Sequence, residues 1–437
     1  MSIKERTKVP KKDSFAAFRF KEFRAYIGVR FFFTFAYQMQ TTILGFYIYE
    51  LTHSKMAIAF VGLAEAIPAV GLALYGGYLT DKYEKRKMML LIFIAVILSS
   101  VVMGMITFAK FAPYLHAAIL PVLYLMIFCN GIARAFNGPV TSTIYAHTIP
   151  REVYPNGSSW NSSTRQVASI LGPLTGGLLY GFAHKLNPGL TGITANFAVI
   201  LTAEFIAFLL IFRLPRYPST VKFAGNIWHS LREGLQFVFV NKMMLYAMSL
   251  DLFSVFFGGA VALLPVFALD ILKVGSEGLG LMRAATSLGA ALTMITMARF
   301  SPLNRPWRNL LIAVSGFGLS IIGFGLSHSF YLSLILLFLQ GAFDSMNVVI
   351  RTTIVQLLTP DRMRGRVSAV TSMFIGSSNE IGDFESGMAA KLLGTVPAVL
   401  FGGGMTILVA IFTYFKTRNL LPVTIDDIHS ADDNPRS

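Results

Sequence analysis

Several charged side chains lie inside long apolar stretches of this chain, where water is not expected to solvate them. The basic members are Arg30, Arg134, Arg165, Arg283 and Arg351, and the acidic members are Glu65, Glu204, Asp251, Asp344, Glu380, Asp383 and Glu385. A charge among apolar residues is costly unless it is paired with an opposite charge. A charged residue at such a place is therefore a candidate for ion transport or substrate binding. We therefore predict that these residues mark a substrate or proton pathway. For each one, a gate ion pair or a place at a helix end is the alternative.

Two of the acidic residues are spaced so that their carboxylates can interact. Glu380 and Asp383 are three residues apart, so they share one face of a predicted helix. A carboxylate that exchanges a proton near neutral pH can couple proton entry to substrate exit. This spacing gives the hypothesis of proton antiport, with protons as the coupling ion.

The elements that must position these residues are apolar segments of membrane length. Of 437 residues, 54% are hydrophobic and 14% charged, and the mean hydropathy is +0.61, which is too apolar for a soluble domain. A helix of roughly 20 apolar residues crosses about 30 Å of hydrocarbon. We predict an all-α membrane protein with twelve transmembrane helices, at 24–49, 56–79, 88–109, 116–146, 157–183, 192–213, 243–270, 277–299, 308–327, 329–358, 366–390 and 395–416.

Lysine and arginine are distributed unevenly around these segments. They gather in both tails and in alternate loops, whereas the other loops hold only Lys55, Lys110, Lys185, Lys273 and Lys391. Because basic loops stay on the cytoplasmic side, both termini are expected there, in a multi-pass protein of the cell inner membrane. The net charge of +15 is therefore a sign of topology and of contact with the lipid bilayer, and nucleic-acid binding is not expected.

The chain divides into two halves that resemble each other. A shift of 210 residues aligns Gly131 with Gly341, Asn137 with Asn347, Gly172 with Gly382 and Gly177 with Gly387. The predicted divisions are a basic cytoplasmic segment at 1–23, a six-helix bundle at 24–213, a linker with an amphipathic helix at 214–242, a second bundle at 243–416 and a cytoplasmic tail at 417–437. Duplicated halves of this kind place a binding site between them near the bilayer midplane.

The loop at 77–87 reads G-Y-L-T-D-K-Y-E-K-R-K, with a glycine, an aspartate and then a basic cluster. It resembles the signature loop between the second and third helices of the major facilitator superfamily. The resemblance implies that Gly77 allows tight helix packing and that Asp81 and Arg86 join a charge network at the cytoplasmic gate. Glu84 stands where that family usually has glycine, which leaves the turn geometry open.

A second motif, G-P-L-T-G-G at 172–177, lies in the fifth predicted helix. It is similar to the antiporter motif of the same superfamily, with Gly172, Pro173, Gly176 and Gly177 at the matching positions. Proline removes a backbone donor and bends a helix, while glycines let a neighbouring helix approach closely. The resemblance implies export, although general small-residue packing is the alternative.

Shorter stretches resemble the enterobactin (siderophore) and macrolide efflux subfamily. They are Phe23-Arg24-Ala25, Arg30-Phe31, Thr52–Ser54, Asp81–Lys87, Pro360–Val367 and Asp383–Gly387. The resemblance implies two pseudo-symmetric six-helix bundles around a cavity, with Arg30, Arg134, Asp251 and Asp344 as cavity candidates. The expected function is secondary active export of a small amphipathic molecule, such as a siderophore, a macrolide or another drug.

Other classes of function fit the sequence less well. No phosphate-binding G-x-x-x-x-G-K-[ST] loop occurs, so ATP hydrolysis is not expected, and we predict a monomeric carrier that is not an enzyme and holds no cofactor or metal. The single cysteine, Cys129, excludes an intrachain disulfide. A nutrient importer, a divalent metal-ion carrier built on Glu380, Asp383 and Glu385, a membrane-embedded metalloenzyme and a membrane scaffold stay as alternatives.

Overall fold

The structure is a computed structural model that describes residues 13–108, 116–186, 191–217, 227–299, 304–360 and 363–424. Within these ranges the chain is helical and contains no strand. Among the residues that the structure describes, eight stretches are long and apolar enough to cross a membrane, at Lys85–Ile106, Ala118–Thr148, Gly192–Ile211, Lys242–Ile271, Gly275–Met297, Pro306–Leu326, Phe330–Leu357 and Thr395–Lys416.

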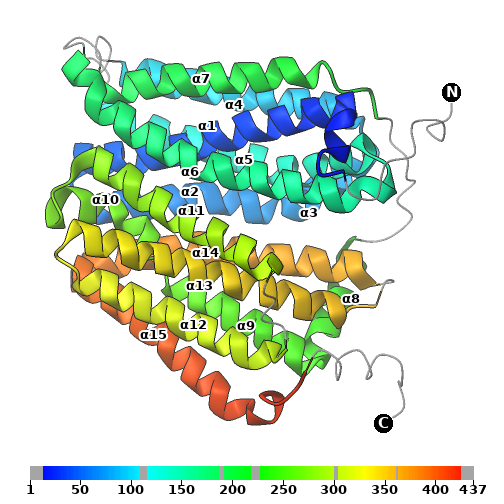
Figure 1. The fold of residues 1–437 in the computed structure, drawn as a ribbon. Helices are drawn as coiled ribbons and strands as arrows, with labels where there is room; N and C mark the ends of the chain where they lie inside the picture. The colour runs from blue at the N-terminus through cyan, green and yellow to red at the C-terminus, as the bar shows by residue number, and fades with distance from the viewer. Residues whose placement is uncertain are drawn as a thin grey trace.

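The first half of the chain forms one group of helices, blue to green in Figure 1. After a short turn of helix at Ala16–Arg19, it contains α1 (Lys21–Thr52), α2 (Lys55–Gly71), α3 (Ala73–Lys82), α4 (Lys85–Thr107), α5 (His116–Thr148), α6 (Tyr154–Leu186) and α7 (Gly192–Ile211). The helix α8 (Ile227–Val240) then leads to the second half.

The second half lies beside the first, green to red in Figure 1. It contains α9 (Lys242–Phe257), α10 (Leu264–Val266), the π-helical turn Phe267–Ile271, α11 (Gly275–Arg299), α12 (Pro306–Leu326), α13 (Phe330–Leu357), α14 (Arg364–Leu393) and α15 (Thr395–Lys416). The halves meet where α6 packs on α11 and α2 packs on α14.

Each predicted segment overlaps a helix, but two of them are interrupted. The second segment divides at Leu72 into α2 and α3, just after Pro68 and Gly71, which are both unfavourable in helix interiors. The seventh leaves regular helix at Gly258 and continues as short helical turns to Ile271. These interruptions were not predicted, because the apolar run continues through both.

Polar side chains begin several of the helices. Ser54 caps α2 and Asn241 caps α9, each by accepting a backbone N–H of the first turn. Glu84 caps α4, where its carboxylate accepts the N–H groups of Arg86 and Lys87 at 2.9 and 3.0 Å. The residue that departs from the family loop therefore starts a helix in place of forming a glycine turn.

Glycines at matching positions of the repeat make matching contacts. A Cβ on Gly131 of α5 would lie 2.5 Å from the carbonyl oxygen of Glu65 in α2, and one on Gly341 of α13 would lie 2.0 Å from that of Thr286 in α11. Across the halves, Gly177 of α6 packs on α11 and Gly387 of α14 packs on α2. The alignment by 210 residues thus joins positions with the same role in helix packing.

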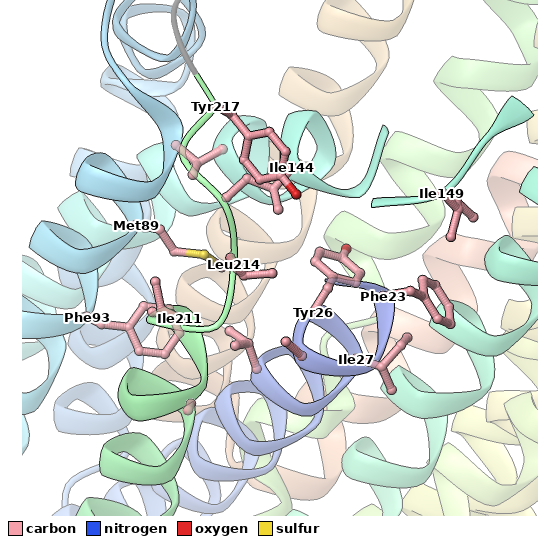
Figure 2. Close-up of a cluster of buried hydrophobic side chains, with 14 of the residues drawn as sticks. Phe23, Tyr26, Ile27, Met89, Phe93, Ile144, Ile149, Ile211, Leu214 and Tyr217 are labelled. Carbon is pink, nitrogen blue, oxygen red and sulfur yellow. The ribbon is translucent and has the colours of Figure 1, made fainter. Parts of the chain in front are cut away.

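The two ends of the helix bundle are packed differently. We call the end that holds α8 and the start of α1 the α8 end. There the first half has its own hydrophobic cluster, which Figure 2 shows around Phe23, Tyr26 and Phe93. At the opposite end one cluster joins the halves, with Phe46 and Tyr49 of α1 packed among residues such as Phe267.

Candidate functional site

A cavity of about 620 Å³ lies between the halves. Its lining comes from α1, α4, α5, α6 and α7 of the first half and from α11 and α13 of the second. The charged lining residues are Arg30, Arg134, Arg165, Glu204 and Asp344, and aromatic surface comes from Phe33 and Tyr37. Such a mixture of apolar surface and a few polar groups is typical of a small-molecule site.

Arg134 lies at this cavity in an ion pair with Glu65. The guanidinium Nη1 is 2.9 Å from the Glu65 carboxylate, and the Tyr37 hydroxyl donates to the same carboxylate at 2.6 Å. The Arg134 guanidinium also sits 5.7 Å from the centre of the Tyr37 ring. Three helices, α1, α2 and α5, are therefore joined by one charged cluster within the first half.

The acidic residues of α14 divide into different environments. The charge of Asp383 acts on Arg283 of α11, which is half-buried near Tyr37 of the first half. Glu385 is half-buried and accepts a long hydrogen bond of 3.5 Å from Ser386. The side chain of Glu380 lies outside the described residues, so the predicted pairing of Glu380 with Asp383 stays a prediction.

Glu204 of α7 ends a chain of buried polar side chains. The Ser100 hydroxyl donates to one Glu204 oxygen at 2.9 Å, Gln40 donates to Ser100 at 3.1 Å, and Asn130 donates to Gln40 at 3.3 Å. The second Glu204 oxygen is buried with no hydrogen-bond partner among the described residues. Because the Glu204 side chain also lines the cavity, the chain forms a polar path at its wall.

In the second half, Asp251 of α9 is paired with Arg351 of α13. Their closest atoms are 3.2 Å apart, and the two side chains are only 6% and 2% exposed. Asn347 donates to the same Asp251 oxygen at 2.7 Å. Asp344, two turns away on α13, lines the cavity and lies within electrostatic reach of this pair.

Arg30 of α1 and Arg165 of α6 differ from the other arginines at the site. Both line the cavity, and their like charges act on each other. The Nε atom of Arg30 is buried without a hydrogen-bond partner among the described residues. Both residues belong to the charged set that the sequence predicts for the pathway.

The glycine motif of α6 makes two contacts at once. Gly172 and Gly176 pack on α1, where a Cβ on Gly172 would lie 2.8 Å from the Phe35 carbonyl oxygen. Gly177 packs on α11, where a Cβ would lie 2.3 Å from the Ser276 carbonyl oxygen. The helix runs without a break through Pro173, whose carbonyl oxygen faces Gly280 of α11.

The signature loop places Arg86 against the end of α7. Its guanidinium donates to the Phe212 carbonyl oxygen at 3.0 Å and lies 5.7 Å from the centre of the Phe212 ring. The Arg86 contacts that the structure gives are thus with a carbonyl and a ring, whereas the resemblance implied a charge network. The surroundings of Gly77 and the side chain of Asp81 lie outside what the structure describes, so the roles of both residues stay predictions.

The structure brings Arg30, Arg134, Arg165, Glu204 and Asp344 to one cavity, whereas Asp251 lies beside it in its own ion pair. It also adds residues that the sequence reasoning missed, namely Tyr37, Gln40, Ser100, Asn130 and Asn347. For Gln40, Asn130 and Asn347 the available signal was an amide side chain within an apolar segment, because an amide also needs hydrogen-bond partners in a membrane. Among the described residues, no three His, Cys, Asp or Glu side chains gather as a metal site would require.

Known proteins match this chain along most of its length. A family model described as the Major Facilitator Superfamily matches residues 27–382 and 264–429. "Enterobactin exporter EntS" of Shigella flexneri is 25% identical over 361 residues, which cover 81% of this chain and 79% of the exporter. The exporter of the same name from Escherichia coli O81 (strain ED1a) is 26% identical over 358 residues, with 81% and 80% covered.

Solved structures share the fold at lower identity. The nucleoside transporter NupG aligns with a TM-score of 0.69 and 15% identity, over 90% of this chain and 98% of that one. A POT family transporter in complex with 5-aminolevulinic acid aligns with a TM-score of 0.71 and 13% identity, over 92% and 97%. At these identities the likeness concerns the fold alone.

Proposed function

Because the chain belongs to the major facilitator superfamily and is a multi-pass membrane transporter, we propose that it exports a small amphipathic molecule by alternating access. The observation that carries this proposal is the cavity of about 620 Å³, whose walls come from both halves. A site at such a junction opens first to one side and then to the other as the halves rock against each other. Its aromatic and charged walls suit a molecule with an apolar body and polar groups.

Export is favoured over import by two observations. The curated relatives are enterobactin exporters by name, and α6 carries the antiporter-like motif at Gly172–Gly177. The substrate class that follows is a siderophore, a macrolide or another drug. The shared fold does not set direction, so import of a nutrient is the competing outcome of the test.

Protons are the proposed coupling ion, and two carboxylates on the cavity wall are the proposed carriers. Glu204 has a buried oxygen without a described partner, and Asp344 lies near the Asp251–Arg351 pair. Each carboxylate lines the space that a substrate would fill, so proton binding and substrate binding can compete there. Glu65 and Asp251 are less suited to this role, because each already holds an arginine.

We propose that the structure has the conformation in which the cavity opens to the cytoplasm. The halves share a hydrophobic cluster at the opposite end, and the Tyr49 hydroxyl of α1 donates there to Asp270 of the second half. With both termini cytoplasmic, as the lysine and arginine pattern predicts, the α8 end faces the cytoplasm. The proposal includes twelve spans in the cell inner membrane and a monomeric carrier.

Export can be tested in a strain from which the gene for this protein is deleted, without knowing the substrate in advance. Strains that carry the wild-type chain, the Gly177→Leu variant or no copy are grown under iron limitation and across a drug panel, and their spent media are compared by mass spectrometry. An exporter restores a secreted compound or drug tolerance only with the wild-type chain. Loss of a compound from the medium in the wild-type strain alone indicates import and contradicts the proposal.

A further inference from the structure

Four of the five arginines at membrane depth fall into two groups, and the fifth, Arg283, lies under the charge of Asp383. Arg134 is paired with Glu65, and Arg351 is paired with Asp251. By contrast, Arg30 and Arg165 form no ion pair and no side-chain hydrogen bond with any described residue. Both line the central cavity, and they are close enough for their like charges to interact.

The acidic residues of the cavity do not neutralise this arginine pair. Glu204 accepts its hydrogen bond from Ser100, and Asp344 lies on α13 of the other half near Asp251 and Arg351. Two guanidinium groups close together at one cavity are costly, since each repels the other and no described residue forms an ion pair with either. An anion bound between them would remove that cost.

The surroundings of the pair indicate the rest of the ligand. Phe33 and Tyr37 of α1 provide aromatic surface in the same cavity, and the Gln38 amide donates to Ser169 of α6 at 3.2 Å. A guanidinium is planar, and its N–H groups match the two oxygens of a carboxylate or a similar oxyanion. A cationic drug would be repelled at this position, and a neutral one would leave the charges unmatched.

We infer that the cavity takes an anionic amphipathic molecule, with an aromatic body and at least one carboxylate or similar oxyanion held by Arg30 and Arg165. This inference rests on the proposed function, because it names the substrate class of the same cavity. It separates two candidates left open above, since acidic siderophores fit the pair and basic macrolides do not.

Binding to the purified full-length protein in detergent tests the inference separately from transport. The probes are benzoate, 2-naphthoate and 1-pyrenebutyrate, each compared with its neutral amide and its amine by calorimetry and ligand-dependent thermal stabilisation. The wild-type protein is expected to bind at least one anion about tenfold or more tightly than the matching amide, and to bind the amine most weakly. This ranking needs no variant, so it holds even if a variant fails to fold.

The variants Arg30→Gln and Arg165→Gln are expected to weaken anion binding by at least about tenfold and to leave amide binding unchanged. Arg165→Lys should retain part of the preference, and Arg308→Gln on α12, away from this cavity, should retain all of it. The inference is overturned if no anion binds, if amide or amine binds as tightly as the anion, or if both glutamine variants keep the preference. Anion binding without any transport in proteoliposomes would instead contradict the proposed function.

Discussion

The Asp251–Arg351 pair of the second half and the residues Arg30 and Arg165 of the first half carry their charges in different ways. In the second half, Asp251 and Arg351 are almost fully buried and neutralise each other between α9 and α13. In the first half, Arg30 and Arg165 line the cavity and have no counter-charge among the described residues. A charge with a protein partner stabilises helix packing, whereas a charge that faces a cavity alone is available to a ligand.

The largest effect on stability is expected from Asp251→Ala. This change leaves the Arg351 guanidinium, only 2% exposed, without its partner, which should lower the free energy of unfolding by about 3–5 kcal/mol. Thermal and denaturant unfolding in detergent measure it. The matched control is the double variant Asp251→Leu with Arg351→Met, which removes both charges and should recover most of the loss. A single variant as stable as the wild type would show that the pair has no structural role.

The next effect concerns the contact between the halves. Gly177→Leu places a side chain against the α11 backbone, where even a Cβ would lie 2.3 Å from the Ser276 carbonyl oxygen, and overpacking of this kind costs typically about 1–3 kcal/mol. Because the strain falls on the closed opposite end, transport should fall more than stability. Gly404→Leu is the control, since a Cβ there meets no atom within 4 Å. Equal transport by both variants would contradict the close contact of α6 with α11.

A smaller and more selective effect is expected at the cavity wall of the first half. Glu204→Gln keeps the shape of the side chain and the hydrogen bond from Ser100, so folding should change little. Proton movement coupled to efflux should fall by at least about tenfold in proteoliposomes, because proton-transfer groups typically contribute that much or more. Glu233→Gln removes a carboxylate that pairs with Arg366 away from the cavity and should keep full coupling. Unchanged coupling in Glu204→Gln would remove this residue from the mechanism.

The smallest effect is expected at the signature loop. Arg86→Gln loses the bond to the Phe212 carbonyl oxygen and the contact with its ring, both near the surface, which should cost less than about 1 kcal/mol. Unfolding and transport assays together measure the change. A complete loss of transport at normal stability would instead support the gate network that the family resemblance implies.

The positions of the helices could be predicted from the sequence better than the interaction partners of the charged side chains. Apolar runs locate each segment, because hydrophobicity along the chain is a local signal. The interruption at Leu72 was missed, since an apolar run does not show where a helix restarts. Which residue pairs with a charged side chain depends on how neighbouring helices are rotated about their axes. A local sequence pattern does not contain that information.

Arg134 illustrates this limit at the site. The repeat aligns Arg134 with Asp344, and both residues reach the cavity, but the ion pair of Arg134 is with Glu65 on α2. In the same way, the Asp251–Arg351 pair joins two predicted residues that no spacing connects. The list of charged residues could be drawn from the sequence, whereas the division into paired and unpaired groups required the fold.

The central claim is that the halves rock about the cavity, and distances between spin labels at the two ends test it most directly. In a Cys129→Ala background, one label pair is placed at Ser159 and Ile295 near the α8 end, and another at His53 and Leu392 at the opposite end. In lipid nanodiscs, adding an anionic probe and changing the pH should shorten the first distance and lengthen the second in the same fraction of molecules. Two distances that stay fixed, or that change in the same direction, would contradict alternating access.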